Sequence, residues 1–392
     1  MKANTVLIIA DDVLSRETSF ITRIAGEVEK ASGAKVDIWS GTEPEPTDRS
    51  LIEGLKFAGK RRYDVIIAIG GGSTIDTAKL INLYSVYPVE NIEEYFGPPI
   101  GAGKPVPGPL KPLIAIPTTA GTGSEASPVA VLTFHDKNMK VRLASDYLRP
   151  VLAILDPKLT VTVPPRVTVS TGLDALMHAI ESFTSKPYYE RLKSQAYCET
   201  TVFQGSNQVT EVLAEKAISL IGENLERAYR NGIDLEARSN MMLASHLAGI
   251  AFSNTGTHIS HAISYALSVL SAEKGFRLPH GIAAAMTGPS LLKVLSNYVP
   301  QKCEKIAYHL RNYLAQENIT PASAAYALYN LLRRLGLPRD LSELGFRESD
   351  VERIVQHTMN EKGLLAQSPM TPTEDLLSEI VRMSINYELL FS

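Results

Sequence analysis

The chain has 392 residues, of which 44% are hydrophobic and 21% are charged, and its formal net charge is −3. This composition excludes a disordered chain, and without a basic excess we expect no nucleic-acid partner. No apolar run approaches the ~20 residues needed to cross a bilayer, so we expect no membrane partner. The only cysteines, Cys198 and Cys303, are far apart in the sequence, which predicts a reducing compartment and a cytoplasmic protein.

The first part of the chain alternates short apolar runs with amphipathic segments. Strands are expected at residues 6–10, 35–39, 64–70 and 113–117, and helices at 17–31 and 48–60. The run at 64–70 is continuously apolar, which is typical of a strand buried on both faces of a parallel sheet. Strand–helix alternation of this kind predicts a doubly wound parallel sheet.

From about residue 165 onward the pattern is helical. Helices are expected at residues 170–184, 209–231, 236–254, 258–270, 282–297, 303–315, 321–335, 348–359 and 373–387. A chain of this length exceeds the size of one hydrophobic core. We therefore predict an α/β domain that binds a dinucleotide at residues 1–160, followed by an all-α domain at residues 161–392.

Two loops have the composition of phosphate-binding loops. Gly70, Gly71, Gly72 and Ser73 follow a buried strand and open a helix, and their backbone N–H groups could cradle a phosphate. The second loop, residues 117–125, follows another strand and reads Pro-Thr-Thr-Ala-Gly-Thr-Gly-Ser-Glu. An open α/β sheet binds nucleotides at the carboxyl ends of its strands. A glycine-rich turn that serves packing alone remains the alternative for the first loop.

Asp174 and His178 are four residues apart in an apolar helical pattern, so both side chains leave the same helix face. A buried carboxylate beside a buried imidazole needs compensation for its lost hydration, and a divalent metal supplies it. The alternative is a carboxylate that orients a core histidine. His258 and His261 lie three residues apart on an expected helix, and His280 lies where a loop meets a helix. These positions could complete a site of three imidazoles and one carboxylate.

The motifs together resemble the iron-containing, group III alcohol dehydrogenase family over nearly the whole chain. They are Gly-Gly-Gly-Ser-x-x-Asp-x-x-Lys at 70–79, Pro-Thr-Thr-x-Gly-Thr-Gly-Ser-Glu at 117–125, Gly-x-Asp-Ala-x-x-His-Ala-x-Glu at 172–181 and Pro-His-Gly at 279–281. Within this family, residues 111–119, 204–207, 234–239 and 261–265 most resemble the hydroxyacid–oxoacid transhydrogenases. The resemblance implies the two-domain architecture shared with dehydroquinate synthase.

The resemblance also implies a set of site residues. The metal, Fe²⁺ most often and Zn²⁺ in some members, would be bound by Asp174, His178, His261 and His280. The cofactor NAD(P) would contact Ser40, Gly41, Gly70, Gly71, Gly72, Ser73, Asp76, Thr118, Thr119, Thr122 and Arg142, with Gly71 to Ser73 on the diphosphate and the threonines on the nicotinamide side. His258 and Tyr265 are candidates for a catalytic proton relay.

The chain departs from the family pattern at several positions. Ser40 and Gly41 stand where many relatives carry an aspartate for the adenosine 2′-hydroxyl, so NADPH should be tolerated and is the expected preference. Tyr265 replaces a histidine, as in the transhydrogenase branch, and Arg142 replaces a lysine that faces the cofactor. The family's leading strand and helix have no counterpart here. Their absence argues against the edge-to-edge homodimer that is usual in the family, so a homodimer is only one of the expected assemblies.

The expected activity is metal-dependent hydride transfer between NAD(P) and a small alcohol, aldehyde or hydroxy acid. The metal would act as a Lewis acid on the substrate oxygen, and the cofactor would carry the hydride. One alternative is a hydroxyacid–oxoacid transhydrogenase that retains its cofactor and uses substrates of the 4-hydroxybutyrate type. A phosphate-eliminating lyase would need a Lys and Arg cluster near the metal, which residues 258–281 lack. A non-catalytic nucleotide-binding protein is the last alternative, and the four filled ligand positions argue against it.

Overall fold

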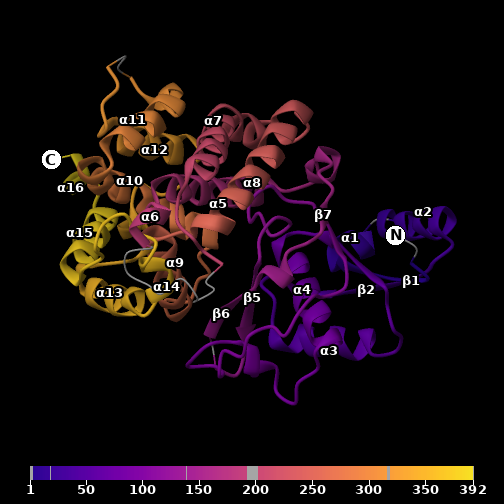
Figure 1. The fold of residues 1–392 in the computed structure, drawn as a ribbon. Coiled ribbons are helices and arrows are strands. Elements are labelled where there is room, and N and C mark those ends of the chain that lie inside the picture. The colour runs from indigo at the N-terminus through magenta and orange to yellow at the C-terminus, as the bar shows by residue number, and fades with distance from the viewer. Residues whose placement is uncertain (1–2, 18, 138, 192–201, 316–317, 392) are drawn as a thin grey trace. The chain divides into compact units, whose positions relative to one another are not determined.

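The computed structural model describes residues 3–17, 19–137, 139–191, 202–315 and 318–391. The chain divides into two compact units, of which the first comprises Met1–Thr119 with Gly123–Thr160 and the second Ala120–Thr122 with Val161–Ser392 (Figure 1). The predicted fold class is confirmed, because the first unit contains a parallel sheet with helices and the second is helical. Cys198 lies outside the described residues.

The main sheet of the first unit has five parallel strands in the order β2–β1–β3–β4–β7. These strands are β1 (Thr5–Asp11), β2 (Lys35–Thr42), β3 (Val65–Gly70), β4 (Leu113–Pro117) and β7 (Leu152–Ala153). The α-helices of this unit are α1 (Asp12–Glu17), α2 (Phe20–Ser32), α3 (Asp48–Ala58) and α4 (Gly72–Val86). The strand order reverses beside β1, and open sheets bind ligands at such a switch point.

The burial of strand β3 on both faces of the sheet explains why its sequence is apolar throughout. All six of its residues are buried. Ile66 and Ala68 belong to one hydrophobic core, whereas Ile67 and Ile69 belong to another. Successive side chains of a strand point to opposite faces of the sheet, so the two cores lie on the two faces.

A second, two-stranded sheet was not expected from the sequence. It is an antiparallel hairpin of β5 (Val129–Phe134) and β6 (Met139–Ala144). A buried ion pair ties it to α4, because Lys79 Nζ lies 3.3 Å from Asp76 Oδ1 and donates to the Val129 carbonyl at 2.5 Å. Asp76 Oδ2 in turn accepts from the Val131 N–H at 3.1 Å. The Lys79 side chain has no exposed surface, so the pair is a structural link inside the unit.

Helix α5 (Pro165–Thr184) lies at the centre of the helical unit. Every residue from Gly172 to Thr184 is buried, and α5 packs against α7, α8 and α10. The longer helices around it are α7 (Gln208–Arg230), α8 (Leu235–Thr255), α9 (Ile259–Glu273), α10 (His280–Tyr298), α11 (Pro300–His309), α12 (Ser323–Arg334), α13 (Val351–Met359) and α15 (Glu374–Ile385). Shorter helices are α6 (Tyr188–Arg191), α14 (Lys362–Leu365) and α16 (Glu388–Phe391).

The helical unit differs from the sequence prediction mainly at helix ends. The helix expected at 303–315 begins instead at Pro300, where proline's missing N–H costs no hydrogen bond, and ends at His309. The helix expected at 258–270 begins at Ile259. Among the described residues, no helix combines the length and the apolar character that a membrane span requires.

Candidate metal centre

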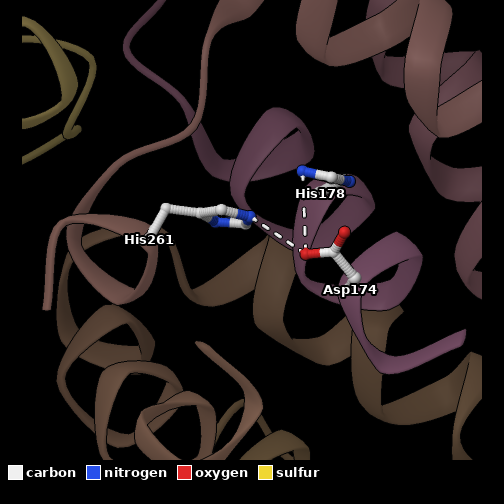
Figure 2. Close-up of side chains that lie close together, drawn as sticks. All are labelled: Asp174, His178 and His261. Carbon is white, nitrogen blue, oxygen red and sulfur yellow. Dashed lines mark ion pairs between the residues drawn. The ribbon is translucent and has the colours of Figure 1, made fainter. Parts of the chain in front are cut away.

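Helix α5 presents Asp174 and His178 one turn apart in the core of the helical unit. The Nε2 atom of His178 lies 3.9 Å from Asp174 Oδ1, and both side chains are buried (Figure 2). Gly172 permits this burial, because a Cβ atom at that position would lie 2.3 Å from Leu225 Cδ1 of α7. The predicted one-face arrangement of the aspartate and the histidine is therefore present.

His261 enters the same site from α9. Its ring stacks on the ring of His178, with centroids 4.6 Å apart, and its Nε2 lies 3.8 Å from Asp174 Oδ1 (Figure 2). One potential ligand atom from each of these three residues lies within 4.8 Å of the other two. The other face of His178 stacks on Phe252 of α8, so neighbouring aromatic groups fix the orientation of the ring.

His280 completes the group as the first residue of α10. Its Nε2 lies 3.7 Å from Asp174 Oδ1, and its Nδ1 lies 3.2 Å from the Ser264 hydroxyl. The ring of Tyr265 stacks on His280 with centroids 5.5 Å apart. The structure therefore brings together all four residues that the resemblance implied as ligands, with Tyr265 beside the fourth.

The chemistry of this group fits a divalent metal. Asp174 Oδ1 and His261 Nε2 are buried and have no hydrogen-bond partner in the described part of the chain. Buried polar atoms rarely lack partners, and here three imidazole nitrogens converge on one such oxygen. Metal–ligand distances of about 2.1 Å in a tetrahedron give ligand separations of about 3.4 Å, close to those observed. Nitrogen and oxygen donors suit Zn²⁺ or Fe²⁺.

Glu181 is a functional candidate that the sequence interpretation did not single out, although it lies in the quoted motif. Its side chain has no exposed surface and accepts hydrogen bonds from the backbone N–H groups of His258, at 3.0 Å, and Ser260, at 2.6 Å. It also contacts Nδ1 of His261 through Oε2. A carboxylate on the far nitrogen of a metal-binding histidine fixes its tautomer, so that Nε2 presents its lone pair to the metal.

The charges of the site favour a cation. Burial alone would raise the pKa of Glu181, but His258, His261 and the backbone donors outweigh it and lower the pKa to about 2. Burial likewise opposes ionisation of Asp174, yet the histidines hold its pKa below its usual value. Burial lowers the pKa of His178 to about 4 against the attraction of Asp174. For His261, burial lowers the pKa, but Glu181 and Asp174 prevail and raise it to about 9. Without a metal, His261 therefore carries a second proton beside the two ionised carboxylates, and a divalent metal bound at Nε2 would replace that proton.

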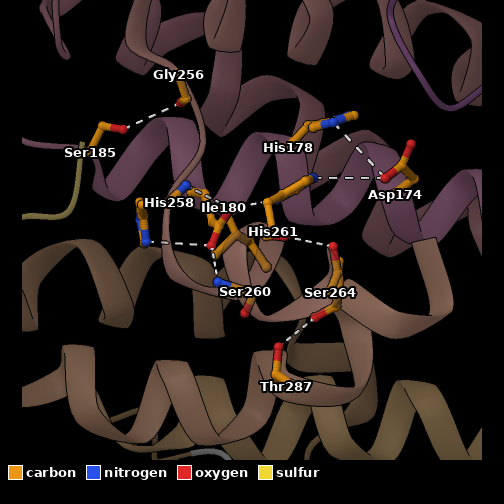
Figure 3. Close-up of polar contacts among 12 residues, drawn as sticks. Asp174, His178, Ile180, Ser185, Gly256, His258, Ser260, His261, Ser264 and Thr287 are labelled. Atoms are coloured by element: carbon orange, nitrogen blue, oxygen red, sulfur yellow. Dashed lines mark hydrogen bonds and ion pairs between the residues drawn. The ribbon is translucent and has the colours of Figure 1, made fainter. Parts of the chain in front are cut away.

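His258 lies apart from the four converging residues. It precedes the first residue of α9 with φ −136° and ψ −115°, so it does not share a helix face with His261, and that expectation is wrong. Its Nε2 lies 3.0 Å from the Thr184 hydroxyl and its Nδ1 3.4 Å from Glu181 Oε1. Figure 3 shows His258 and His261 as separate parts of this hydrogen-bonded network.

The two predicted phosphate loops adjoin within the first unit. Gly70 ends β3 and Gly71 precedes the first residue of α4, so the loop opens directly into a helix N-terminus. Thr118 N donates to the Gly70 carbonyl at 3.0 Å, and a Cβ atom at Gly71 would lie 3.5 Å from the Thr119 hydroxyl. Free backbone donors of this first turn suit an anionic group.

The remaining predicted cofactor residues are more dispersed. Gly72 and Ser73 begin α4, whereas the carboxylate of Asp76 is buried and pairs with Lys79. Thr122 belongs to the second unit. The last of these residues lie in strands: Ser40 and Gly41 in β2, and Arg142 in β6.

Replacing Gly281 with alanine is expected to disturb the metal centre without removing a ligand. A Cβ atom there would lie 2.0 Å from the Ser170 carbonyl oxygen and 2.8 Å from Asp174 Cβ, so α10 must move away from α5 and carry His280 with it. We expect Zn²⁺ affinity, measured by chelator competition, to fall by about 10–100-fold. Gly26→Ala is the control, since a Cβ there meets no atom within 4 Å. Equal affinity in both variants would contradict this account of Gly281.

Comparisons with known proteins identify one family. Residues 1–157 match the model of the family described as iron-containing alcohol dehydrogenase, and residues 196–385 match its C-terminal domain. The mitochondrial hydroxyacid-oxoacid transhydrogenase of Bos taurus is 36% identical over 396 aligned positions, covering 98% of this chain and 84% of the bovine protein. Its Homo sapiens counterpart is 34% identical with the same coverage.

Solved structures of similar proteins match this chain over nearly its whole length. The iron-containing alcohol dehydrogenase of Thermococcus thioreducens has a TM-score of 0.82 and 30% identity, covering 98% of this chain and 93% of that one. Sulfoacetaldehyde reductase from Bifidobacterium kashiwanohense, solved in complex with NAD⁺, has a TM-score of 0.81 and 27% identity, covering 98% of this chain and 91% of that one.

One sequence prediction is overturned by these relatives and another is confirmed. The expected cytoplasmic location is wrong, because the curated relatives are named as mitochondrial enzymes. It depended on the number of cysteines and the lack of a long apolar run, and neither property distinguishes one reducing compartment from another. The resemblance drawn from the motifs is confirmed. The chain belongs to the iron-containing alcohol dehydrogenase family and is an oxidoreductase that acts on CH–OH groups.

Proposed function

We propose that this protein transfers hydride between NAD(P) and a small alcohol or hydroxy acid at a metal held by Asp174, His178, His261 and His280. The observation that carries this proposal is the convergence of three imidazole nitrogens, each within 4.0 Å, on the partnerless Oδ1 atom of Asp174. When bound, Fe²⁺ or Zn²⁺ supplies Lewis-acid polarisation of the substrate oxygen. The residues of the chain hold this site in a fixed geometry.

The residues around the ligands have distinct proposed roles. Glu181 keeps the proton of His261 on Nδ1, which leaves Nε2 free to bind the metal. His258 is a positioning residue in this proposal, because its ring nitrogens face Thr184 and Glu181. Tyr265 remains the candidate for moving the hydroxyl proton, because its ring stacks directly on the ligand His280.

For the cofactor, we propose that the N-terminus of α4 binds the diphosphate and that NADPH is accepted as well as NADH. Ser40 and Gly41 offer no carboxylate near the end of β2. The next acidic residues are engaged locally: Glu43 accepts from the Thr47 hydroxyl at 2.7 Å, and Glu45 lies 3.7 Å from Lys140. A 2′-phosphate would therefore meet little uncompensated negative charge.

A second function is favoured by the curated relatives, which are transhydrogenases at 34–36% identity. In that case the cofactor stays bound and accepts hydride from a hydroxy acid such as 4-hydroxybutyrate. It then returns the hydride to an oxo acid such as 2-oxoglutarate, so no free cofactor is consumed. The two functions differ in whether reduced cofactor is released.

The test uses the full chain loaded with Fe²⁺ or Zn²⁺. We expect consumption of added NADH or NADPH with small aldehydes and semialdehydes, followed by nicotinamide absorbance. In parallel, 4-hydroxybutyrate deuterated at its carbinol carbon is mixed with 2-oxoglutarate without added cofactor. Deuterium in the resulting hydroxy acid would support the transhydrogenase. If neither assay shows turnover with either metal, the proposed function is refuted.

A further inference from the structure

The first unit contains a cavity of about 500 Å³ that the proposed reaction does not use. Arg61 and Arg62, which precede β3, line it together with Lys111, which precedes β4. The cavity therefore lies at the amino ends of these strands, whereas the phosphate loops follow their carboxyl ends. Five or six residues at about 3.3 Å each separate the two sheet edges by roughly 15–20 Å.

Lys111 is held in place by a buried amide. Its backbone N–H donates to Asn82 Oδ1 at 3.2 Å, and Asn82 Nδ2 donates to the Lys111 carbonyl at 2.7 Å. Asn82 is 2% exposed, so the two hydrogen bonds between Asn82 and the Lys111 backbone hold Lys111 against the core. The ammonium group donates to the Ser85 hydroxyl at 3.1 Å, which leaves further donors on the nitrogen.

Three cationic side chains line the cavity, Arg61, Arg62 and Lys111, and the neighbouring carboxylates are Asp37 and Asp64. Arg61 pairs with Asp37 at 3.0 Å, but no ion pair of the described residues includes Arg62 or Lys111. Asp64 Oδ2 accepts from the backbone of Asn4 at 2.8 Å and of Thr5 at 3.1 Å, and these bonds lower the pKa of Asp64, whose negative charge acts on both Arg62 and Lys111. Three cations thus face two carboxylates, which leaves an excess of one positive charge. Burial, and then the charge of Arg62, lower the pKa of Lys111. A cation in this position is stabilised by an incoming anion.

The usual structural role for such cations is to neutralise the carboxyl ends of helices, and both α3 and α4 end near the cavity. Backbone N–H groups satisfy part of these ends. Gly59 N donates to the Leu55 carbonyl at 2.9 Å, and Tyr87 N donates to the Leu83 carbonyl at 2.8 Å. Within the described ranges, the side-chain nitrogens of Arg62 and Lys111 donate to no helix-end carbonyl.

Part of the cavity lining is apolar. Tyr84, Val89 and Ile92 contribute to it, and the Tyr84 hydroxyl donates to the Ile92 carbonyl, which satisfies the polar end of that side chain. Small-molecule sites combine an apolar surface of this kind with a few fixed polar groups in volumes of roughly 300–1,000 Å³. The volume suits a small metabolite, and the charge suits an anion.

We infer that this cavity binds a small organic anion whose carboxylate or phosphate group contacts Lys111 and Arg62. The apolar body of the ligand lies against Tyr84, Val89 and Ile92. The residues that line the cavity belong to the first unit and those of the metal centre to the second, so the inference does not depend on the proposed reaction. Within the first unit, the ligand would bind at the sheet edge opposite the nucleotide loops.

The experiment measures binding of phenyl phosphate, benzoate and inorganic phosphate to the full chain by calorimetry. We expect saturable binding of phenyl phosphate or benzoate, and about tenfold weaker binding in each of Lys111→Met and Arg62→Met, since each removes one charged donor. Lys60→Met is the control, because Lys60 is an exposed neighbour that does not line the cavity. Lys60→Met removes one positive charge, as each cavity variant does, but it changes no residue that lines the cavity.

The probes also separate the two anion types. Binding of phenyl phosphate alone supports a phosphate ligand, and binding of benzoate alone supports a carboxylate ligand. Inorganic phosphate that binds as tightly as phenyl phosphate would overturn the role of the apolar lining. The inference is also overturned if no probe binds, if both cavity variants bind like the wild type, or if Lys60→Met weakens binding equally. Arg62→Met guards against a folding defect in Lys111→Met, because Arg62 is exposed.

Discussion

Replacing His261 with alanine is expected to leave the purified protein without stoichiometric metal and without hydride-transfer activity. His261 Nε2 is buried without a hydrogen-bond partner, and it lies 3.8 Å from Asp174 Oδ1, which also has none. Changes to residues outside a metal's own ligands already reduce affinity by about 10–100-fold, so loss of a ligand should cost at least about 100-fold. Metal content after dialysis, measured by plasma mass spectrometry, gives the answer independently of activity.

The control for this substitution is His357→Ala. His357 is exposed on α13 and lies outside the metal cluster, so its loss removes the same side chain without touching the site. Unchanged metal content in His261→Ala would remove this histidine from the ligand set. Loss of metal in the control as well would show that the measurement reports general instability.

The sequence predicted those parts of the fold in which local pattern and burial agree. The apolar run at 64–70 became β3, which is buried on both faces, and the strand-to-helix glycines became the N-terminus of α4. The β5–β6 hairpin was missed although residues of β5 alternate between buried and partly buried positions. Its place is set by the bonds of Lys79 to Val129 and of Asp76 to Val131, which join segments that are distant in the sequence.

The site could be predicted in part for the same reason. Asp174, His178 and Glu181 follow each other at intervals of four and three residues on one buried helix. These intervals predict that the three side chains lie on one face of the helix. The spacing of His258 and His261 suggested a second such face, but α9 begins between them at Ile259. Helix ends are the least certain part of a periodic pattern, because periodicity does not mark the first helical residue. The spacing alone does not separate the two histidines, whereas the resemblance implied His261 as the ligand, and the structure places His261 and not His258 beside Asp174.

Substitution of Glu181 by glutamine is expected to weaken both the metal site and the fold of the helical unit. The two carboxylate oxygens receive three N–H donors: Oε1 accepts from Ser260 N, and Oε2 accepts from His258 N and His261 Nδ1. A glutamine amide has only one accepting oxygen, and its NH₂ group would face a donor in either orientation. At least one buried donor is then unsatisfied, which costs about 1–3 kcal/mol of unfolding free energy.

The lost charge has a second consequence, because in the described part of the chain Glu181 and Asp174 are the carboxylates that pair with the buried histidines of the site. We expect Zn²⁺ affinity in chelator competition to fall by about 10–100-fold. Glu215→Gln is the matched control, since Glu215 also contacts a histidine, His309 at 3.1 Å, but belongs to a surface network with Lys305. If Glu181→Gln and Glu215→Gln bound Zn²⁺ equally well, Glu181 would be a structural residue only. A drop confined to Glu181→Gln, with partial recovery in Glu181→Asp, would show that a charged acceptor behind His261 sets the affinity of the metal.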